Sequence, residues 1–472
     1  DFAMDPDWAQ DGSSVAWQEW SVPAMAWDDS RVTIGAADRA PRAMALPHPA
    51  AVSQPRFAPD GSALGFLCDA NGWLNLWVAE VDGSDPRPLV DEPFEHGGPT
   101  WGPGERSWAW SPDGRSVAFC RNEGGFGRLC VVEVATGAVH DVDRGVFASL
   151  SWAGDRLAAL RSGARTPVQV VVYQHPGGPD RRRATVARGP VAGFEAAGLV
   201  EPEPVSWAGE EIDGIGSQVH GRLYRSSRRS RLKQPGVGAD AAHPLILWVH
   251  GGPTGQTLAG WHPRSSFFLD RGWNVLQVDP RGSTGWGRAC ARALNGRWGD
   301  LDVDDIAAGI RAAGERGWGD PGRIAIMGGS SGGLAVLGVL IRHPQLCAAG
   351  VDLYGVSDLF SLDETTHRFE AHYNDILVGP LPAAAGTWRD RSPVTHLDRI
   401  RAPLLVLHGT ADDSVVPAQS EAVVAGLERR GATVEHHWYQ GEGHGWSRPE
   451  TVEDELARTE AFLSRHVLRG QQ

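Results

Sequence analysis

The sequence predicts two domains of different class, an all-β domain over residues 1–200 and an α/β domain over residues 205–472. The length is the first observation behind this prediction, because 472 residues exceed what one ordinary hydrophobic core holds. The second is a change of pattern along the chain. Short apolar segments between Gly, Asp and Pro turns give way, after about residue 205, to apolar segments that alternate with helix-period segments.

A weak repeat in the N-terminal part predicts its architecture. Each unit places an aromatic residue before a tight turn of Asp-Gly or Gly-Asp and an alternating strand, as in WAWSPDGRSVAF. The anchor aromatic residues are Trp8, Phe57, Trp110 and Trp152, spaced 49, 53 and 42 residues apart. Such a period of short strands is typical of β-propeller blades, and a plain β-sandwich is the alternative. Since about four units are visible and propellers of this kind usually have more blades, we expect an incomplete propeller that lacks an N-terminal part. A genuinely short propeller is the alternative.

The C-terminal part reads as a mostly parallel, doubly wound sheet. A strand pair at 210–225 and a basic segment at 226–241, expected to be a surface loop, lead into it. Five apolar strands follow, at 245–251, 274–280, 323–329, 348–355 and 403–409. Helix-period segments lie between or after them, at 303–317, 419–431 and 453–467. Near-continuous apolar strands separated by helices predict a sheet covered on both faces, with ligands at the carboxyl ends of its strands.

Charge and cysteine content exclude several classes of partner. The net charge of −14 argues against nucleic acid or an anionic membrane as the main partner. No segment approaches the roughly 18 consecutive apolar residues that a membrane span needs, and the first residues do not read as a secretory signal. The five cysteines show no close pairing, so we expect buried free thiols and a cytoplasmic location.

The segment RIAIMGGSSGGLAVL carries the first chemical signal. Residues 328–332 fit G-x-S-x-G between a strand and a helix, the pattern of a nucleophile elbow. Its glycines permit a turn too sharp for a Cβ, and the strained central residue presents its hydroxyl above the sheet. We therefore expect Ser330 to be the nucleophile and the backbone N–H of Ser331 to face the oxyanion. A flexible turn is the alternative interpretation.

A serine nucleophile needs a base, and the downstream sequence supplies one in the order Ser, Asp, His. Asp412 and Asp413 follow the strand PLLVLHG, and His444 lies in a Gly-rich turn after the strand VEHHWY. We expect His444 to accept the serine proton and Asp412 to fix its tautomer. Taken singly, Asp412 could cap a helix and His444 could be a surface residue. The two other histidines of this region, His436 and His437, are expected within the strand.

The oxyanion requires a second donor where negative charge develops. The loop WVHGGPTG follows an early strand, and its glycines leave their N–H groups unobstructed. We favour the backbone N–H of Gly252. The side chain of His250 is the alternative donor.

Six motifs, in this order, resemble the prolyl oligopeptidase family of serine peptidases. They are HGGP, DPRGSTGWG, NGRWGDLDVDD, GGSSGG, HGTADDSVVPAQS and GEGHGW. The likeness is strongest over 205–468, and it points to the acylaminoacyl-peptidase and dipeptidyl-aminopeptidase-like branch, which includes puromycin-hydrolase-like bacterial aminopeptidases. It implies an α/β-hydrolase domain, a propeller cap that admits only small or unfolded peptides to an internal cavity, and the first aspartate of the DD pair as the triad acid. The chain departs from other branches by having His250 where they have a tyrosine, and its propeller is shorter.

The same resemblance implies that 366–379 borders the substrate pocket. Phe369, Glu370 and Tyr373 are its candidates, with helix packing and a solvated carboxylate as the alternative. An aminopeptidase needs a carboxylate for the free amine of the substrate, and Glu370 or an acid of the propeller could serve. Arg281 follows the strand NVLQVDP and could bind a substrate carbonyl, although we favour a structural ion pair for it.

These patterns together predict a serine peptidase that hydrolyses short peptides or aminoacyl amides through an acyl-enzyme, most simply as an aminopeptidase or other exopeptidase. The alternatives are an esterase or amidase for a small metabolite, and a propeller scaffold with a vestigial hydrolase domain. No metal-binding or phosphate-binding motif appears in the sequence, so we predict no metal and no cofactor. The residue preference at the scissile bond and the presence of a homo-oligomer are left open.

Overall fold

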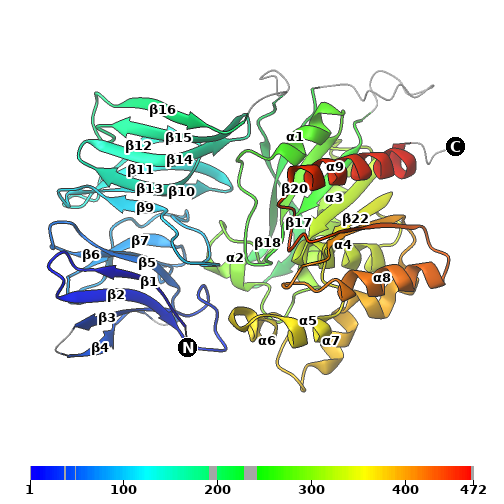
Figure 1. The fold of residues 1–472 in the computed structure, drawn as a ribbon, viewed down its shortest axis with the longest axis horizontal. Coiled ribbons are helices and arrows are strands. Elements are labelled where there is room, and N and C mark those ends of the chain that lie inside the picture. Colours follow the sequence, from blue (N-terminus) through cyan, green and yellow to red (C-terminus); the bar gives the residue numbers. More distant parts are fainter. Residues whose placement is uncertain (1, 37–38, 48, 191–198, 228–241, 469–472) are drawn as a thin grey trace. The chain divides into compact units, whose positions relative to one another are not determined.

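The computed structural model describes residues 2–36, 39–47, 49–190, 199–227 and 242–468 (Figure 1). It divides into two compact units. The first consists of residues up to 193 together with Leu258–Trp261 and Thr284–Ala291, and the second consists of the other residues from 194 onward. The domain bounds expected from the sequence, 1–200 and 205–472, stay a prediction.

The described residues of the first unit form four antiparallel sheets of four strands, each strand paired with the next along the chain. The first two sheets are β1 Phe2–Trp8, β2 Ser14–Trp20, β3 Arg31–Ala36 and β4 Arg39–Ala43, then β5 Val52–Phe57, β6 Leu64–Cys68, β7 Asn75–Ala79 and β8 Arg87–Pro88. The last two are β9 Trp108–Trp110, β10 Ser116–Glu123, β11 Phe126–Glu133 and β12 Val139–Arg144, then β13 Val146–Ala153, β14 Arg156–Gly163, β15 Thr166–Gln174 and β16 Arg182–Arg188.

The anchor aromatic residues of the sequence repeat occupy equivalent places in these sheets. Trp8, Phe57 and Trp110 each end the first strand of a sheet, and Trp152 lies one residue before such an end. The predicted phrase of aromatic residue, tight turn and alternating strand is therefore the first hairpin of each sheet.

Consecutive sheets bury side chains against each other because successive residues of a strand point to opposite faces. In β6, Phe66 belongs to the core shared with the first sheet, whereas Leu67 belongs to the core shared with the third sheet. In β10, Phe119 packs toward the second sheet and Ala118 toward the fourth. Four meander sheets stacked in this way are the arrangement of propeller blades, which confirms the propeller-like all-β domain.

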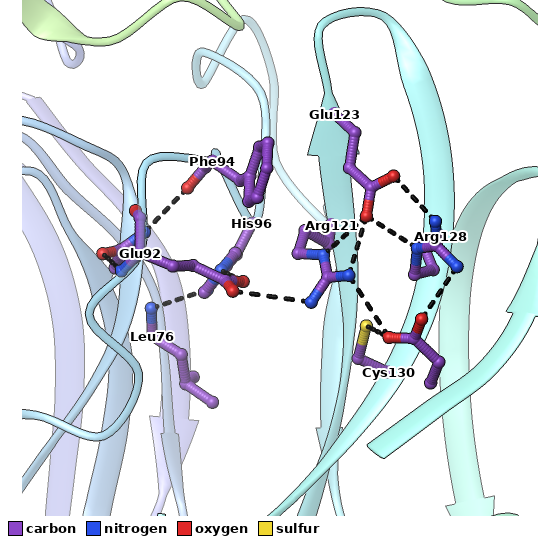
Figure 2. A network of polar contacts seen from close by, with 10 residues as sticks. Leu76, Glu92, Phe94, His96, Arg121, Glu123, Arg128 and Cys130 are labelled. Atoms are coloured by element: carbon purple, nitrogen blue, oxygen red, sulfur yellow. Dashed lines mark hydrogen bonds and ion pairs between the residues drawn. The ribbon is translucent and has the colours of Figure 1, made fainter. Parts of the chain in front are cut away.

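A polar network joins the second and third sheets (Figure 2). Glu92 and His96 come from the connection between these sheets, and their side chains meet at 2.9 Å. Glu92 also accepts a 3.4 Å hydrogen bond from Arg121 of β10, which in turn contacts Glu123 at 2.7 Å. Arg128 of β11 extends the network by a 2.6 Å bond to Glu123. The network therefore links one sheet to the next through alternating charges.

In the second unit, the part of the chain that the structure describes forms an eight-stranded sheet in the order β17-β18-β20-β19-β21-β22-β23-β24. Its strands are β17 Glu203–Ile212, β18 Gly216–Tyr224, β19 Leu245–Val249, β20 Asn274–Asp279, β21 Ile324–Gly329, β22 Ala349–Leu353, β23 Leu404–Gly409 and β24 Val434–Tyr439. The pairings of β18 with β17 and β20 are antiparallel, and all others are parallel. The predicted mostly parallel sheet and the predicted strand pair before it are confirmed.

Helices cover both faces of this sheet. α3 Leu301–Glu315, α4 Ser331–Arg342 and α8 Ala418–Arg429 share one core with the strands. On the other face, α1 Pro263–Asp270 packs on β20 and α9 Pro449–Leu463 packs on α1 and β23. The shorter helices of this unit are α5 Leu359–Thr365, α6 Tyr373–Leu377 and α7 Ala385–Arg391, with 3-10 turns at Pro321–Arg323, Arg368–Glu370 and Pro393–Arg399 and a π-turn at Ser464–Leu468. All but the last residue of α2 Arg288–Arg292 belongs to the first unit.

Most of the predicted basic loop cannot be compared, because residues 228–241 lie outside the described part of the chain. Within the described ranges, every helix is too short or too polar to be a membrane-spanning segment.

Candidate active site

The segment 328–333 forms a strained corner between a strand and a helix. Ser330 directly follows β21 and precedes α4, with φ 57° and ψ −125°. Positive φ is a sparsely populated conformation for a residue with a side chain, and it persists only where the surroundings enforce it. The backbone N–H of Ser330 donates a 3.0 Å hydrogen bond to the carbonyl of Leu353 at the end of β22. The corner is thus tied to the neighbouring strand.

Close approach of the backbone explains the glycines on both sides of the serine. A Cβ on Gly328 would lie 2.6 Å from the carbonyl oxygen of Gly332, and one on Gly332 would lie 2.6 Å from that of Val249. Since real Cβ atoms essentially never come that near a backbone oxygen, the turn could not form with alanine at these positions. The sequence signal for an elbow therefore has a direct steric cause.

Two backbone segments meet at the corner where an oxyanion would need donors. Ser331 is the first residue of α4, so its N–H has no acceptor within the helix. Its buried hydroxyl accepts a 3.0 Å hydrogen bond from the Trp298 indole. On the other side, a Cβ on Gly251 would lie 3.4 Å from the Ser330 Cβ, which places the loop after β19 against the serine. The next residue of that loop, Gly252, has a φ of 127°.

His250 is held inside this loop by both ring nitrogens. Nδ1 lies 2.7 Å from the Gly251 carbonyl, and Nε2 lies 2.9 Å from the Ser283 hydroxyl. Burial lowers the pKa of His250, opposed only in part by Asp279, so the ring is neutral near pH 7. A carbonyl can only accept, so the single ring hydrogen is at Nδ1 and points to Gly251. This arrangement favours the loop backbone over the His250 side chain as oxyanion donor.

A buried ion pair lies next to the same loop. The Arg222 guanidinium donates two 2.6 Å hydrogen bonds to the two carboxylate oxygens of Asp279, and both side chains are fully buried. Gln256, a few residues beyond HGGP, donates a 2.9 Å hydrogen bond to Asp279. The carboxylate at the end of β20 therefore anchors the segment after β19.

Asp412 and His444 are joined by a short hydrogen bond. His444 Nδ1 lies 2.7 Å from Asp412 Oδ2. The other oxygen, Oδ1, accepts the backbone N–H groups of Ser414 and Val415 at 3.0 and 2.9 Å. Burial by itself would raise the pKa of Asp412, but the hydrogen bonds from His408, His444 and Val415 outweigh it and hold the pKa well below its usual value. The carboxylate is therefore ionised near neutral pH and faces the imidazole.

Tyr354 links the histidine loop to the serine corner. It follows β22 with a φ of 43°, and its ring lies 4.9 Å, centroid to centroid, from the His444 ring in an edge-on contact. The same phenol approaches the corner, because a Cβ on Gly329 would lie 2.9 Å from its ring. The ring of Tyr354 therefore lies close both to the His444 ring and to the residue before the nucleophile.

The loop that carries His444 is shaped by Glu442. Its Oε2 accepts hydrogen bonds from the backbone N–H and the hydroxyl of Ser447 at 2.9 and 2.6 Å, and its Oε1 accepts one from Arg448 Nε at 3.0 Å. A Cβ on Gly409 would lie 2.4 Å from the Glu442 carbonyl, so the end of β23 touches this loop. The strand that precedes Asp412 and the loop that carries His444 are therefore packed directly against each other.

The residues expected at the substrate pocket differ in their surroundings. Tyr373 is buried, and its hydroxyl lies 3.2 Å from the Thr254 N–H and 2.5 Å from the Thr254 hydroxyl, at the oxyanion loop. Glu370 is half-buried, and it accepts a 3.2 Å hydrogen bond from Thr366. The Phe369 ring is tilted against the His367 ring, with ring centroids 6.3 Å apart. Tyr373 therefore contacts the loop beside the serine.

Arg281 forms hydrogen bonds to buried groups inside the second unit. It is 1% exposed, and its guanidinium donates to Asp305 at 2.6 and 2.9 Å and to the carbonyls of Glu210 and Gly216 at 2.5 and 2.9 Å. Its donors are thus bonded to α3 and to the facing ends of β17 and β18. The arrangement is the structural ion pair that we favoured over a contact with a substrate carbonyl.

The sequence reasoning gave no role to Tyr354, His408 or Glu442. His408 is the last side chain of β23 before a glycine, and its position within the HGTADDSVVP motif was the available signal. The described residues contain no group of three or more His, Cys, Asp or Glu side chains arranged to hold a metal ion.

Comparison with known proteins places this geometry in a family. Residues 261–469 match the model of the prolyl oligopeptidase family. The solved structure of a puromycin-hydrolyzing peptidase from Mycobacterium tuberculosis is 30% identical, with a TM-score of 0.90 over 99% of this chain and 70% of that one. The chain belongs to the prolyl oligopeptidase family.

The matches to curated relatives extend over a smaller share of both chains than the match to that solved structure. Dipeptidyl aminopeptidase BIII of Pseudoxanthomonas mexicana is 37% identical over 48% of this chain and 34% of that protein. The acylamino-acid-releasing enzyme of Sus scrofa is 26% identical over 76% of this chain and 50% of that protein. The matched region thus spans between a third and a half of these relatives.

Proposed function

We propose that this protein is a serine peptidase that removes residues from short peptides or hydrolyses aminoacyl amides through an acyl-enzyme. The observation that carries the proposal is the 2.7 Å hydrogen bond between His444 and Asp412, on a loop that shares Tyr354 with the strained Ser330 corner. The similarity to a dipeptidyl aminopeptidase, an acylamino-acid-releasing enzyme and a puromycin-hydrolyzing peptidase supports the same proposal.

The proposed reaction begins with proton transfer from Ser330 to His444. Because the Nδ1–H of His444 is donated to Asp412, the free Nε2 acts as the base while the serine oxygen attacks the scissile carbonyl. The oxyanion is stabilised by the N–H groups of Ser331 and Gly252. Collapse of the tetrahedral intermediate breaks the C–N bond, and the imidazolium returns its proton to the leaving amine. Water then repeats the sequence on the ester and releases Ser330.

The substrate contacts form the second part of the proposal. Tyr373, with its hydroxyl on Thr254, borders the pocket next to the oxyanion loop. The half-buried carboxylate of Glu370 is proposed as the group that receives a free substrate amine, with Phe369 beside it. We do not assign a substrate contact to Arg281, because its donors are used internally.

A panel of substrates tests this proposal on the purified chain. We expect turnover of aminoacyl p-nitroanilides with a free amine, weaker turnover of the N-blocked analogues, and loss of both in Ser330→Ala with an unchanged unfolding curve. The matched control is Ser151→Ala, an exposed change in β13 of the first unit, for which we expect unchanged turnover. Turnover retained by Ser330→Ala, or turnover of simple acyl esters only, contradicts the peptidase assignment.

We also propose a cytoplasmic location. All five cysteines are free thiols, which suits a reducing compartment. Cell fractionation tests this proposal, and recovery of the protein outside the cytoplasmic fraction contradicts it.

A further inference from the structure

A second histidine touches the proposed triad acid, and the mechanism above does not use it. His408 lies in β23 and is fully buried. Its Nε2 is 2.9 Å from the Val415 carbonyl oxygen and 3.3 Å from Asp412 Oδ2. Its Nδ1 is 2.7 Å from the hydroxyl of Ser420, in the first turn of α8. Both ring nitrogens are therefore engaged.

The partners of His408 decide where its hydrogen lies. The Val415 carbonyl can only accept, so Nε2 must carry a hydrogen whatever the charge of the ring. That N–H points between the carbonyl and the nearby Asp412 Oδ2. His408 therefore presents a donor to the same carboxylate oxygen that receives the Nδ1–H of His444.

Val415 closes a ring of contacts around the carboxylate. Its carbonyl accepts from His408, and its N–H donates at 2.9 Å to Asp412 Oδ1. The third contact, from His408 to Asp412 Oδ2, completes the ring. With both carboxylate oxygens fixed from this side, the carboxylate plane cannot rotate without breaking one of the three contacts.

We propose that His408 is a positioning residue for the Asp412–His444 pair. It holds Oδ2 toward His444, and its N–H takes up part of the negative charge that Asp412 would otherwise offer to the His444 imidazolium. The inference rests on the proposed function, since it assigns His408 to the same site. Its consequence is that His408 sets both the reaction rate and the pH at which the catalytic imidazole becomes protonated.

Other titratable groups face His408 from the neighbouring strand. Asp352 of β22 is fully buried and close enough to His408 for a charge–charge interaction. The Tyr354 ring, directly after β22, lies 6.4 Å from the His408 ring, centroid to centroid. Burial raises the pKa of Asp352 to about 7, which makes it a second source of pH dependence in the same range. Asp352→Asn is therefore measured beside the His408 variants to separate the two effects.

Replacement of His408 by leucine and by glutamine tests the inference. His408→Leu removes the donor, and we expect kcat to fall on the order of 10- to 100-fold, with KM within about twofold, because the reacting groups are misaligned. The acid limb of the kcat/KM profile is expected to move to higher pH, because His444 then receives the full charge of Asp412. His408→Gln keeps an N–H near the Nε2 position, so it is expected to restore most of both properties. His436→Gln, an exposed change on β24, is the control without effect.

A second readout separates this inference from the proposed function. The Nδ1 proton of His444 gives a downfield NMR resonance when it is bonded to Asp412, and its observation requires no substrate. We expect faster solvent exchange of this proton in His408→Leu and recovery in His408→Gln. If the wild type hydrolyses no substrate, the proposed function fails while the resonance still tests the positioning role.

The results that would overturn the inference are equally defined. The first is a folded His408→Leu variant with the kcat, the acid limb of the kcat/KM profile and the His444 Nδ1 resonance of the wild type. The second is a fall in kcat while neither the acid limb nor the resonance changes. Should His408→Leu not fold, Ser420→Ala serves instead, since it removes the partner of Nδ1 and keeps the ring. It is expected to shift the same properties in the same direction by a smaller amount, and an unchanged limb and resonance there contradict the inference.

Discussion

Each unit of the molecule contains a fully buried histidine with both ring nitrogens engaged, but the polar networks that start from the two histidines end in different groups. In the β unit, His96 accepts the Leu76 N–H at 3.0 Å and therefore donates through Nε2 to Glu92 at 2.9 Å (Figure 2). The carboxylate then meets the Arg121 guanidinium, which does not lose its proton in proteins. This chain of contacts can hold two sheets together, but it cannot take up or release a proton at its far end.

In the α/β unit, His408 also donates through Nε2 toward a carboxylate, that of Asp412. There the carboxylate meets the partly exposed imidazole of His444, a side chain that can accept and release a proton during a reaction. The comparison teaches that the group at the end of a buried network decides what the network can do. A network that ends in arginine can hold two sheets together, and we call it the clamp. A network that ends in a partly accessible histidine can act as a base.

The test with the largest expected effect replaces the carboxylate in each network by the corresponding amide. In Asp412→Asn the amide would donate to His444 and enforce the wrong tautomer, so we expect kcat for aminoacyl nitroanilides to fall by roughly 10,000-fold. In Glu92→Gln we expect kcat within about twofold of the wild type, because that network ends in arginine. Similar losses in both variants would remove the distinction between clamp and base.

The second test concerns the buried ion pair beside the oxyanion loop. Arg222→Met leaves Asp279 as an uncompensated buried charge, so we expect a loss of about 3–5 kcal/mol in the free energy of unfolding. The matched control is Arg458→Met, because the Arg458–Asp454 pair is about 41% exposed on each side and is expected to contribute less than about 1 kcal/mol. Urea unfolding of both variants measures the difference. An Arg222 variant as stable as the Arg458 variant would contradict the anchoring role.

A third, pH-dependent test uses Asp352. Burial raises its pKa from the usual 3.8 to about 7, so the folded state binds a proton that the unfolded state has lost between these values. Its contribution to stability is therefore largest below pH 4 and declines as the pH rises toward 7, by up to about 1.4 kcal/mol per pH unit. In Asp352→Asn that decline disappears, which unfolding titrations from pH 4 to 8 would detect. Parallel stability profiles of variant and wild type would refute the assignment.

The smallest expected effect belongs to the clamp. Arg121→Met removes the cation between Glu92 and Glu123, and we expect a loss of about 1 kcal/mol, smaller at high salt, with unchanged kcat. Unfolding at low and high salt, together with nitroanilide turnover, measures both parts. A tenfold fall in kcat would show that the β-unit network also serves the chemistry.

Sequence patterns were sufficient for the features that depend on local sterics and periodicity. The apolar strands before Ser330 and Asp412, the glycines around the serine and the four aromatic anchors all follow from close approach or from alternation, and these can be recognised in one sequence. The assignment of Ser330, Asp412 and His444 remains a prediction, now supported by the hydrogen bond between the last two.

Other features could not be predicted, because they depend on contacts between distant segments. The position of His408 against Asp412 requires the fold of the 412–415 loop, and the edge-on packing of Tyr354 against His444 joins residues 90 apart in the chain (444 − 354). Arg281 illustrates the converse case. Its position after a strand resembled a substrate contact, and only the burial of Asp305 beside it distinguishes the ion pair.

Active-site labelling tests the central claim most directly, namely that the imidazole end of the buried network activates Ser330. The chain is treated with a fluorophosphonate and the modified peptide is located by mass spectrometry. We predict a single adduct on Ser330, formed slowly in Asp412→Asn and at the wild-type rate in Glu92→Gln. Absence of the adduct from Ser330 in the folded wild type, or equal rates in the wild type and Asp412→Asn, would contradict the account.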